Sequence, residues 1–518
     1  MNRTNLFDGG RLYGRPADER CIQVENGILQ SFHPSGMATG PEKIDLGNGF
    51  VYPGFIDAHL HTLSHGLSLD QVDLTTCLSA EACTEEVRRQ TLDLLEGRWV
   101  EGRGWNRNLW ENPAFPTRED LDRAAPGNPV ALSSIDGHAL WVNSAALEIA
   151  GINRNTPDPS GGQILRDTGR NPVGILVETA MESIRAQIPE PTTDVRRRAI
   201  RNAMKAYARE GITSVHDCNG MEMADDLDAL REDGRLSVRF YNMLPASWLT
   251  RAMSEHWRTG NGDAFARIGP VKVFTDGALG PNTAAMLEPY EGSNNSGVIV
   301  TEQDTLNDII VKASNADLQV ACHAIGDLAV RSVLDAVEGA RKSGKPPWRP
   351  RIEHAQITHP DDIPRLKELD VIASMQPVHC TSDMQMADRF WGERARWSYT
   401  WRSLQRAESA LAFGSDCPVE SCSVLEGLYA AVTRKRHGRP ATGWYPEECV
   451  DINTALQAYT IGAAYASGEE DEKGSLTIGK MADFVVLDRA LTEIPPEEIL
   501  QTRIMLTVVG GEVVYDGR

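Results

Sequence analysis

Two histidines separated by a single residue are the first candidates for chemistry in this 518-residue chain. His59 and His61 lie in the run GFIDAHLH, whose apolar residues are typical of a buried strand. Side chains two positions apart on a strand point to the same face, so both imidazoles can bind one ion. Two strand histidines with ordinary hydrogen-bond partners would give the same pattern, so the pair alone leaves both interpretations open.

Four further residues with ligand-forming side chains follow at the ends of later apolar runs. They are Lys272 in VKVFTDG, His323 in VACHAIGD, His354 in RIEHAQ and Asp416 in LAFGSD. If these runs are strands of one parallel barrel, their carboxyl ends meet at one face, where barrel enzymes build their sites. Together with the histidine pair, they favour a metal centre over isolated core histidines.

Eight β-rich runs alternate with helical segments through the middle of the chain. They are GFIDAHLH, GITSVHDC, LSVRFYNML, GPVKVFTDG, LQVACHAIGD, PRIEHAQ, DVIASMQP and ALAFGSD. Repeated strand–helix units predict a parallel sheet covered by helices, and eight strands close an α/β fold of the TIM (β/α)8 barrel type. A doubly wound open sheet is the alternative architecture.

Two regions fall outside the barrel, which we expect to span residues 53–469. Residues 1–52 and 470–518 contain short β-rich runs joined by turn signals, with too few apolar residues for separate cores. We therefore expect the two ends to pair into one small β-sandwich domain. Residues 70–205 exceed the length of one crossover helix and predict a subdomain inserted after the first strand.

The bulk composition excludes several classes of protein. The net charge of -21 argues against nucleic acid or an anionic membrane surface as a partner. No apolar run approaches the roughly 20 residues that cross a bilayer, and the N-terminus lacks the apolar stretch of a secretory signal. The nine cysteines form no CxxC pair. We expect a cytoplasmic protein with reduced thiols and a small-molecule substrate, and base rates favour a homodimer.

The order of these motifs resembles the amidohydrolase superfamily, most closely its YtcJ-like branch, often called amidohydrolase family 3, which includes N-substituted formamide deformylases. The likeness extends over almost the whole chain, through GWNRNLW, DGHALWVNSAAL, DPSGGQILRD, DGALG, HAIGD, EHAQ, SMQPVH, GSDCPVE, AVTR and GSLTIGKMADFVVLD. It implies a hydrolase that cleaves a non-peptide carbon–nitrogen bond of a small molecule by metal-activated hydroxide.

The resemblance also implies a set of metal ligands in two groups. The first ion would be held by His59, His61 and Asp416. The second would be held by His323 and His354, with Lys272 bridging the two as a carbamate. Carbamylation by CO₂ turns a cationic amine into an anionic oxygen donor, which can bridge two cations. A lysine paired with Asp276 or another carboxylate is the alternative, and it would leave one metal per chain.

Imidazole and carboxylate ligands favour Zn²⁺, although Mn²⁺, Fe²⁺, Co²⁺ and Ni²⁺ accept similar ligands. By the same resemblance, Asp416 would also carry the proton from the attacking water to the departing nitrogen. We predict an amide as the substrate, with an N-substituted formamide as one candidate. An ester, a carbamate, a heterocyclic C–N bond, or a regulatory or binding relative without activity are the alternatives.

A few histidines and one aspartate receive weaker assignments. His138 in DGHALWVN and His379 in SMQPVHC are candidates for substrate contacts, with a turn or supporting role as the alternative. His216 and Asp327 are predicted to orient the metal ligands through hydrogen bonds, because metal-bound imidazoles usually donate their second N–H to an acceptor. His65 has no strand-end context and is assigned to a loop or the surface.

Overall fold

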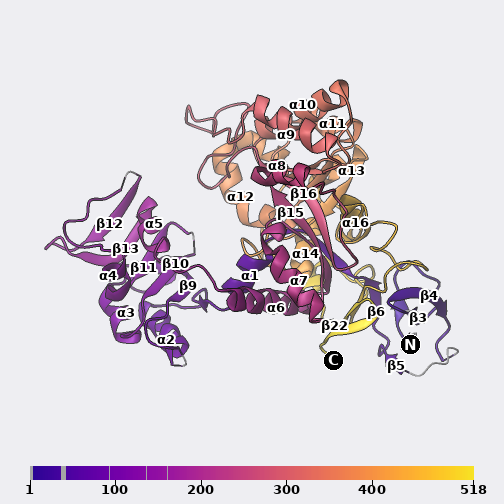
Figure 1. The fold of residues 1–518 in the computed structure, drawn as a ribbon, viewed down its shortest axis with the longest axis horizontal. Coiled ribbons are helices and arrows are strands. Elements are labelled where there is room, and N and C mark those ends of the chain that lie inside the picture. The colour runs from indigo at the N-terminus through magenta and orange to yellow at the C-terminus, as the bar shows by residue number, and fades with distance from the viewer. Residues whose placement is uncertain (1–3, 37–41, 93, 136, 160) are drawn as a thin grey trace. The chain divides into compact units, whose positions relative to one another are not determined.

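The computed structural model describes residues 4–36, 42–92, 94–135, 137–159 and 161–518 (Figure 1). The chain divides into two compact units. The barrel unit consists of Met1–His65 and Ile200–Arg518, and the inserted unit of Gly66–Ala199. Each unit has its own hydrophobic core.

Eight parallel strands form the central sheet of the barrel unit. In spatial order they are β7 (Phe55–Leu60), β14 (Ile212–Asp217), β15 (Arg239–Pro245), β16 (Ala266–Phe274), β17 (Val320–Ala324), β18 (Arg351–His354), β19 (Ile372–Met375) and β20 (Leu411–Phe413). All eight runs predicted from the sequence are present. The backbone N–H of Asp416, just after β20, donates to the carbonyl of His59 on β7 at 2.6 Å. The first and last strands therefore meet. This confirms the predicted TIM barrel and excludes the alternative, a doubly wound open sheet.

Helices follow the strands and cover the outside of the barrel. They are α1 (Thr62–Ser68), α6 (Thr193–Arg209), α7 (Ala224–Glu232), α8 (Leu249–Ser254), α9 (Gln303–Asn315), α10 (Asp327–Ser343), α11 (Ile363–Glu368), α12 (Pro377–Trp391), α13 (Trp401–Arg406), α14 (Val424–Thr433), α15 (Ile452–Ala458) and α16 (Ile461–Ser467). In α10 the buried residues Val330, Val333, Leu334 and Val337 recur at helical spacing. This apolar stripe packs the helix onto the sheet.

The two chain ends share a small β-region. A five-stranded sheet contains β2 (Arg11–Leu12), β6 (Phe50–Pro53), β21 (Phe484–Leu487), β22 (Ile504–Val509) and β23 (Glu512–Asp516). A four-stranded sheet contains β1 (Thr4–Asp8), β3 (Cys21–Glu25), β4 (Ile28–His33) and β5 (Glu42–Asp45). Phe7 and Phe484 meet edge to face at 4.9 Å between ring centroids, so residues from both ends build one core.

The inserted unit has a six-stranded sheet of its own. The strands are β8 (Val72–Asp73), β9 (Val100–Trp105), β10 (Val130–Ser134), β11 (Ala139–Val142), β12 (Gly162–Arg166) and β13 (Pro172–Glu178), and the helices are α2 (Ala80–Thr91), α3 (Arg118–Ala124), α4 (Ser144–Ile149) and α5 (Glu182–Arg185). Trp105 and Trp141 are buried and contact each other at 6.3 Å between ring centroids. These large side chains make the unit a domain with its own core.

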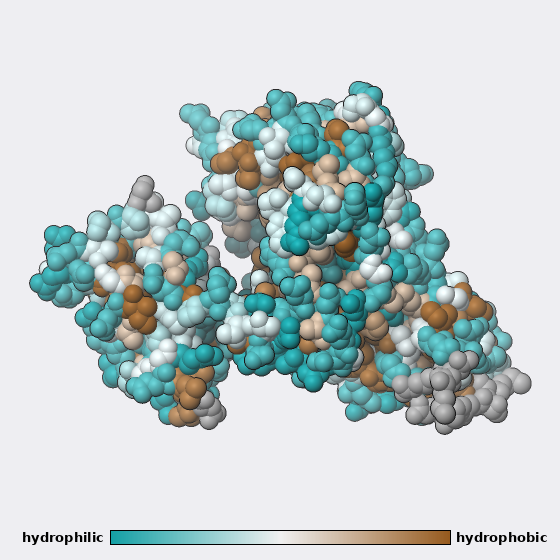
Figure 2. Space-filling model, in the orientation of Figure 1, coloured by the Kyte–Doolittle hydropathy of each residue, from teal (hydrophilic) through white to brown (hydrophobic). Residues whose placement is uncertain are grey.

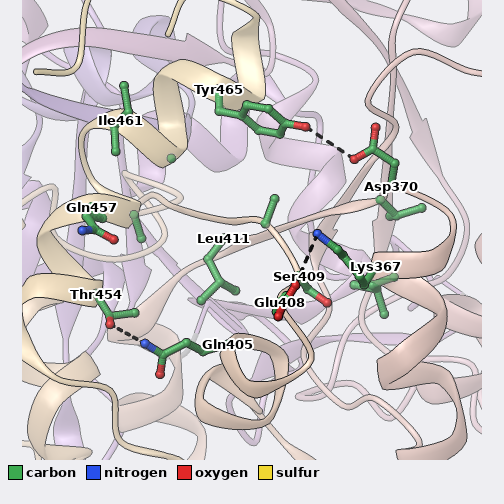
Figure 3. A pocket seen from close by; sticks show the side chains of 15 residues that line it. Lys367, Asp370, Gln405, Glu408, Ser409, Leu411, Thr454, Gln457, Ile461 and Tyr465 are labelled. Atoms are coloured by element: carbon green, nitrogen blue, oxygen red, sulfur yellow. Dashed lines mark hydrogen bonds and ion pairs between the residues drawn. The ribbon is translucent and has the colours of Figure 1, made fainter.

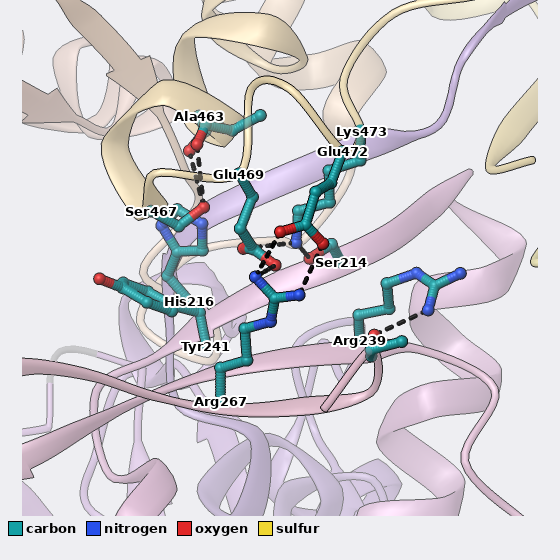
Figure 4. A network of polar contacts seen from close by, with 12 residues as sticks. Ser214, His216, Arg239, Tyr241, Arg267, Ala463, Ser467, Glu469, Glu472 and Lys473 are labelled. Carbon is teal, nitrogen blue, oxygen red and sulfur yellow. Dashed lines mark hydrogen bonds and ion pairs between the residues drawn. The ribbon is translucent and has the colours of Figure 1, made fainter. Parts of the chain in front are cut away.

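A network of paired charges lies at the amino ends of the barrel strands (Figure 4). The Lys473 ammonium donates to the Ser214 hydroxyl at 2.7 Å and lies 2.8 Å from the Glu469 carboxylate. Arg267 contacts Glu469 at 3.5 Å and Glu472 at 2.6 Å. The network joins β14 and β16 to the segment that follows α16, so it ties the end of the barrel to the C-terminal strands.

Hydrophilic residues dominate the face of the molecule shown in Figure 2, in keeping with the charged fraction of 24%. Among the described residues, no helix combines the length and apolar character that crossing a membrane requires.

Candidate metal centre

One cavity of about 330 Å³ opens at the carboxyl ends of the barrel strands. Among the residues that line it are all six side chains predicted as ligands, which are His59, His61, Lys272, His323, His354 and Asp416. The fold therefore brings together residues that lie far apart in sequence, such as His59 and Asp416, which are 357 positions apart. Their function as ligands stays a prediction that this convergence supports.

Two ligand candidates adopt unusual backbone conformations. His354 at the end of β18 has a φ of 74°, and Asp416 after β20 has a φ of 60°. Residues other than glycine rarely occupy this region, because the β-carbon crowds the backbone. Such strain persists where the surrounding fold imposes it, and it concentrates at functional sites.

Each of the first two histidines has one ring nitrogen fixed by a hydrogen bond. His59 Nδ1–H donates to the Glu353 carboxylate at 2.5 Å. His61 Nδ1–H donates to the side-chain carbonyl of Asn219. Because an acceptor holds the proton on Nδ1, the Nε2 lone pair of His59 remains for an ion, and Nε2 of His61, which faces the Asp416 carboxylate at 3.2 Å, is the nitrogen that an ion would take.

The other two histidines are held in the same manner. His354 Nδ1–H donates to the side-chain carbonyl of Gln376 at 2.8 Å, which leaves its Nε2 lone pair for an ion. His323 is reversed, because its Nε2–H donates to the backbone carbonyl of Gly277 at 2.9 Å. Its Nδ1 is therefore the nitrogen left for an ion.

Three of the four histidines are neutral at neutral pH, which metal binding requires. Burial, followed by the charge of Lys272, lowers the pKa of His59 to about 4 and the pKa of His323 to about 4. Burial and the neighbouring His323 lower the pKa of His354 well below its ordinary value. His61 is the exception, because hydrogen bonding to the Asp416 carboxylate outweighs burial and raises its pKa.

The Asp416 carboxylate lies among three imidazoles. Its Oδ1 is 3.6 Å from His59 Nε2 and 3.2 Å from His61 Nε2, and its Oδ2 is 3.7 Å from His379 Nε2. Burial raises its pKa, but the hydrogen bond with His61 and the other histidines outweigh burial and hold the pKa well below its usual range. Ligand atoms of His59, His354 and Asp416 lie within 4.8 Å of one another, so the cluster joins residues from both predicted groups.

Lys272 is buried without a hydrogen-bond partner. Its side chain is 4% exposed and its Nζ makes no hydrogen bond. The alternative partner from the sequence, Asp276, instead accepts backbone N–H groups of Ala285, Ile325 and Gly326 at 2.9, 3.0 and 2.8 Å. Lys272 Nζ lies over the Phe274 ring, 5.3 Å from its centroid, and the described residues place no carboxylate in an ion pair with it. A buried amine facing a cluster of candidate ligand histidines therefore fits a carbamate, whose oxygens would bind the ions of the site.

The two candidates for substrate contact lie in different units. His379, in the first turn of α12, lines the cavity, with Asp383 one turn later. His138 belongs to the inserted unit, where its side chain is 56% exposed and its Nδ1 lies 3.0 Å from Glu178. A substrate contact by either residue stays a prediction.

Two predicted supporting residues have other partners. His216 accepts a hydrogen bond from Arg351 at 2.9 Å, and the carboxylate of Asp327 accepts the backbone N–H of Leu287 at 2.8 Å. The assignment of both to hydrogen bonds with the ligand histidines is wrong, because His216 points into the ionic interior of the barrel and Asp327 holds a loop.

The acceptors that hold the predicted ligand histidines were not predicted from the sequence. Glu353, Asn219 and Gln376 each lie at or just after the end of a barrel strand, and Glu353 directly precedes His354. That strand-end position is the signal that could have found them, because side chains there meet at the same face. Cys218 was also missed, although its sulfur groups with nitrogens of His59 and His61.

A larger cavity of about 440 Å³ lies at the opposite ends of strands β19 and β20 (Figure 3). Its lining includes Leu411 at the start of β20, together with Lys367, Asp370, Glu408 and Tyr465. None of its lining residues is a histidine or cysteine. Size alone therefore does not mark the reactive site, and the ligand chemistry assigns it to the smaller cavity.

A model of a family described as "Amidohydrolase family" matches residues 42–515. The chain belongs to this family. A putative amidohydrolase YtcJ from Bacillus subtilis is 33% identical over 99% of this chain and 99% of its own length. An N-substituted formamide deformylase from Arthrobacter pascens is 28% identical over 96% of this chain and 97% of its own length.

A solved structure supports the same relationship for this amidohydrolase. An uncharacterized metal-dependent hydrolase from Pyrococcus furiosus superposes with a TM-score of 0.79 at 31% identity, covering 95% of this chain and 100% of its own. The predicted resemblance to the YtcJ-like branch is confirmed. The protein is thus a metal-dependent hydrolase that acts on carbon–nitrogen bonds.

Proposed function

We propose that this amidohydrolase cleaves the amide bond of a small N-substituted amide, with an N-substituted formamide as the best candidate. One observation carries the proposal: four histidines, Asp416 and an unpartnered buried Lys272 converge in one cavity. The full-length similarity to an N-substituted formamide deformylase supports the choice of bond.

The donor set suits one or two divalent ions, with Zn²⁺ favoured by imidazole and carboxylate ligands. His59, His61 and Asp416 would hold one ion, His323 and His354 the other, and carbamylated Lys272 would bridge them. A bound ion of this kind lowers the pKa of coordinated water to about 7 and polarises the substrate carbonyl.

Asp416 is placed to move the proton that hydrolysis requires. Its ionised carboxylate faces the cavity, so one oxygen can accept a proton from water. The same group can then donate that proton to the departing nitrogen, which must leave as a neutral amine. His379 Nε2, 3.7 Å from Asp416 and without a hydrogen-bond partner, can donate to a substrate oxygen beside it.

The cavity wall has room for an apolar substituent. Phe274 and Val419 line it with 50% and 68% of their surface exposed, and Leu279 and Ile325 add further apolar surface. A small formyl group needs little space near the ligands, so most of the 330 Å³ would accept the nitrogen substituent.

The test is hydrolysis of three matched compounds by metal-loaded protein: an N-alkylformamide, the corresponding N-alkylacetamide and the alkyl formate ester. We expect formate release from the formamide to be fastest. In Asp416→Asn, kcat for the formamide should fall on the order of 10²–10⁴-fold, the usual size of acid–base catalysis. Faster hydrolysis of the acetamide would overturn the formyl assignment, and a clear preference for the ester would overturn the amide.

A further inference from the structure

A second cluster of metal-ligating side chains lies beside the predicted hydrolytic centre. His65, Cys417 and Cys422 each offer one ligand atom, and these atoms all lie within 4.8 Å of one another. All three residues belong to the barrel unit. None of them lines the cavity that contains the six predicted ligands, so the cluster is a separate arrangement.

Three different elements supply this thiol–imidazole cluster. His65 lies on α1, Cys417 follows β20, and Cys422 lies just before α14. His65 is 7% exposed and Cys417 3%, and Cys422 is half-buried. The assignment of His65 to a loop or the surface is therefore wrong, because α1 turns its ring into the core against Tyr207, with ring centroids 5.3 Å apart.

The spacing of the cluster suits a tetrahedral ion. Zn²⁺ binds sulfur at about 2.3 Å and imidazole nitrogen at about 2.0–2.1 Å, so neighbouring ligand atoms lie roughly 3.5–3.8 Å apart. Ligand atoms within 4.8 Å of one another reach that spacing by small side-chain movements. The two thiols already share a hydrogen bond, so their sulfur atoms face each other.

We propose that His65, Cys417 and Cys422 form a second metal site, which binds Zn²⁺ independently of the hydrolytic centre. Thiolate is the form that ligates, so each cysteine releases its thiol proton to solvent when the ion binds. Two thiolates and one imidazole select a softer ion than the nitrogen and oxygen donors of the main cavity do. A water completes the tetrahedron.

An ion at this site would stabilise the backbone next to the hydrolytic centre. Cys417 directly follows Asp416, and its carbonyl accepts the backbone N–H of His61 at 2.9 Å. The backbone N–H of His65 donates to the carbonyl of His61, also at 2.9 Å. An ion held by this cluster therefore fixes the backbone that carries two hydrolytic ligands. It also fixes the loop containing Val419 and Glu420, which line the cavity.

Cobalt loading of the reduced, full-length protein tests the proposal without using activity. Co²⁺ takes the same ligands as Zn²⁺ and gives a sulfur-to-metal charge-transfer band in the near ultraviolet only when thiolates coordinate it. The six predicted hydrolytic ligands contain no sulfur. We expect the wild type to show the band, and Cys422→Ser to lose it together with one bound Co²⁺ per chain.

Two further serine variants locate the sulfur. Cys449→Ser is the matched control, because Cys449 is also half-buried but lies outside the cluster. Cys218→Ser tests whether the band comes from the cysteine beside His59 and His61. Both variants should keep the band. A band missing from the wild type, retained by Cys422→Ser or lost with Cys218→Ser would overturn the proposal, as would recovery of a Cys417–Cys422 disulfide from cobalt-loaded protein.

Discussion

Two buried lysines at opposite ends of the barrel differ in whether their ammonium groups have polar partners. Lys473 at the amino end is 2% exposed, and its ammonium lies 2.7 Å from the Ser214 hydroxyl and 2.8 Å from the Glu469 carboxylate. Lys272 at the carboxyl end is 4% exposed and has no hydrogen-bond partner. Burying an unpaired ammonium costs several kcal/mol.

The contrast indicates that Lys473 stabilises the fold, whereas Lys272 is available for modification or for binding a ligand. Every charge in the Lys473 network has an opposite charge within reach, so that end of the barrel is complete without any added group. At the other end, neutral imidazoles direct their lone pairs into the cavity that contains Lys272. The difference follows the general division of TIM barrels into a stabilising and a reactive face.

The largest effect should come from Lys272→Ala. Without the proposed bridging carbamate, we expect the metals bound at the hydrolytic centre to fall from two per chain to one or none, counted by inductively coupled plasma mass spectrometry in a Cys422→Ser background that lacks the proposed thiol–imidazole site. Hydrolysis should fall on the order of 10³-fold, because charge stabilisation at the reacting atoms is lost. One metal in both proteins would mean a mononuclear enzyme. No metal in the wild type would favour a binding protein without activity.

Lys473→Met should act on stability and leave the metal count unchanged. The substitution leaves Glu469 buried with Arg267, at 3.5 Å, as its remaining charged partner. Removal of one partner from a buried ion pair costs about 3 kcal/mol of unfolding free energy, measured by urea unfolding. The double variant Lys473→Met with Glu469→Gln is the control, and it should recover part of the loss. If Lys473→Met changed the metal content and left the stability unchanged, Lys473 would not have the purely structural role that distinguishes it from Lys272.

The barrel was predictable because its signals are local. Each strand is a short apolar run ended by a polar residue, and α10 repeats its apolar residues at helical spacing. The six ligand candidates were predictable for the same reason, since each lies at or beside a strand end. The pairing of chain ends followed from two regions with too little apolar surface for separate cores.

The hydrogen-bond partners of the ligands were harder to predict, because pairing depends on the register between strands. Glu353 lies 294 positions after His59 in sequence, yet it accepts the hydrogen bond from that ring. The sequence had instead favoured His216 as a residue that orients the ligand histidines. His65 was misassigned because helix α1, which buries it, begins directly after a strand and is only seven residues long. The closure of the barrel therefore decides which side chains meet across it, and local sequence patterns do not show these contacts.

Glu353→Gln should weaken metal binding while the ligands themselves remain. Glu353 holds the Nδ1 proton of His59 and is itself held by Arg351 at 2.8 Å. Loss of such a supporting carboxylate costs about 10–100-fold in metal affinity, measured by competition with a chelating dye. Asp383→Asn is the comparison, because Asp383 lines the same cavity and bonds to Gln356 and Tyr399 without contacting His59. Equal weakening in both variants would contradict a specific role for Glu353.

The smallest effect should appear in the acid dependence of stability. Burial raises the pKa of Glu469, but the charge of Lys473 outweighs burial and holds the pKa below its ordinary value. A carboxylate with a lowered folded-state pKa stabilises the fold above its unfolded pKa, and that contribution is lost as pH falls through the folded value. Unfolding free energies of wild type and Glu469→Gln, measured from pH 6 down to about pH 3, should therefore converge only below about 4.5. A difference between the two proteins that stays constant across this range would show that the paired charges at the amino end do not depend on ionised Glu469.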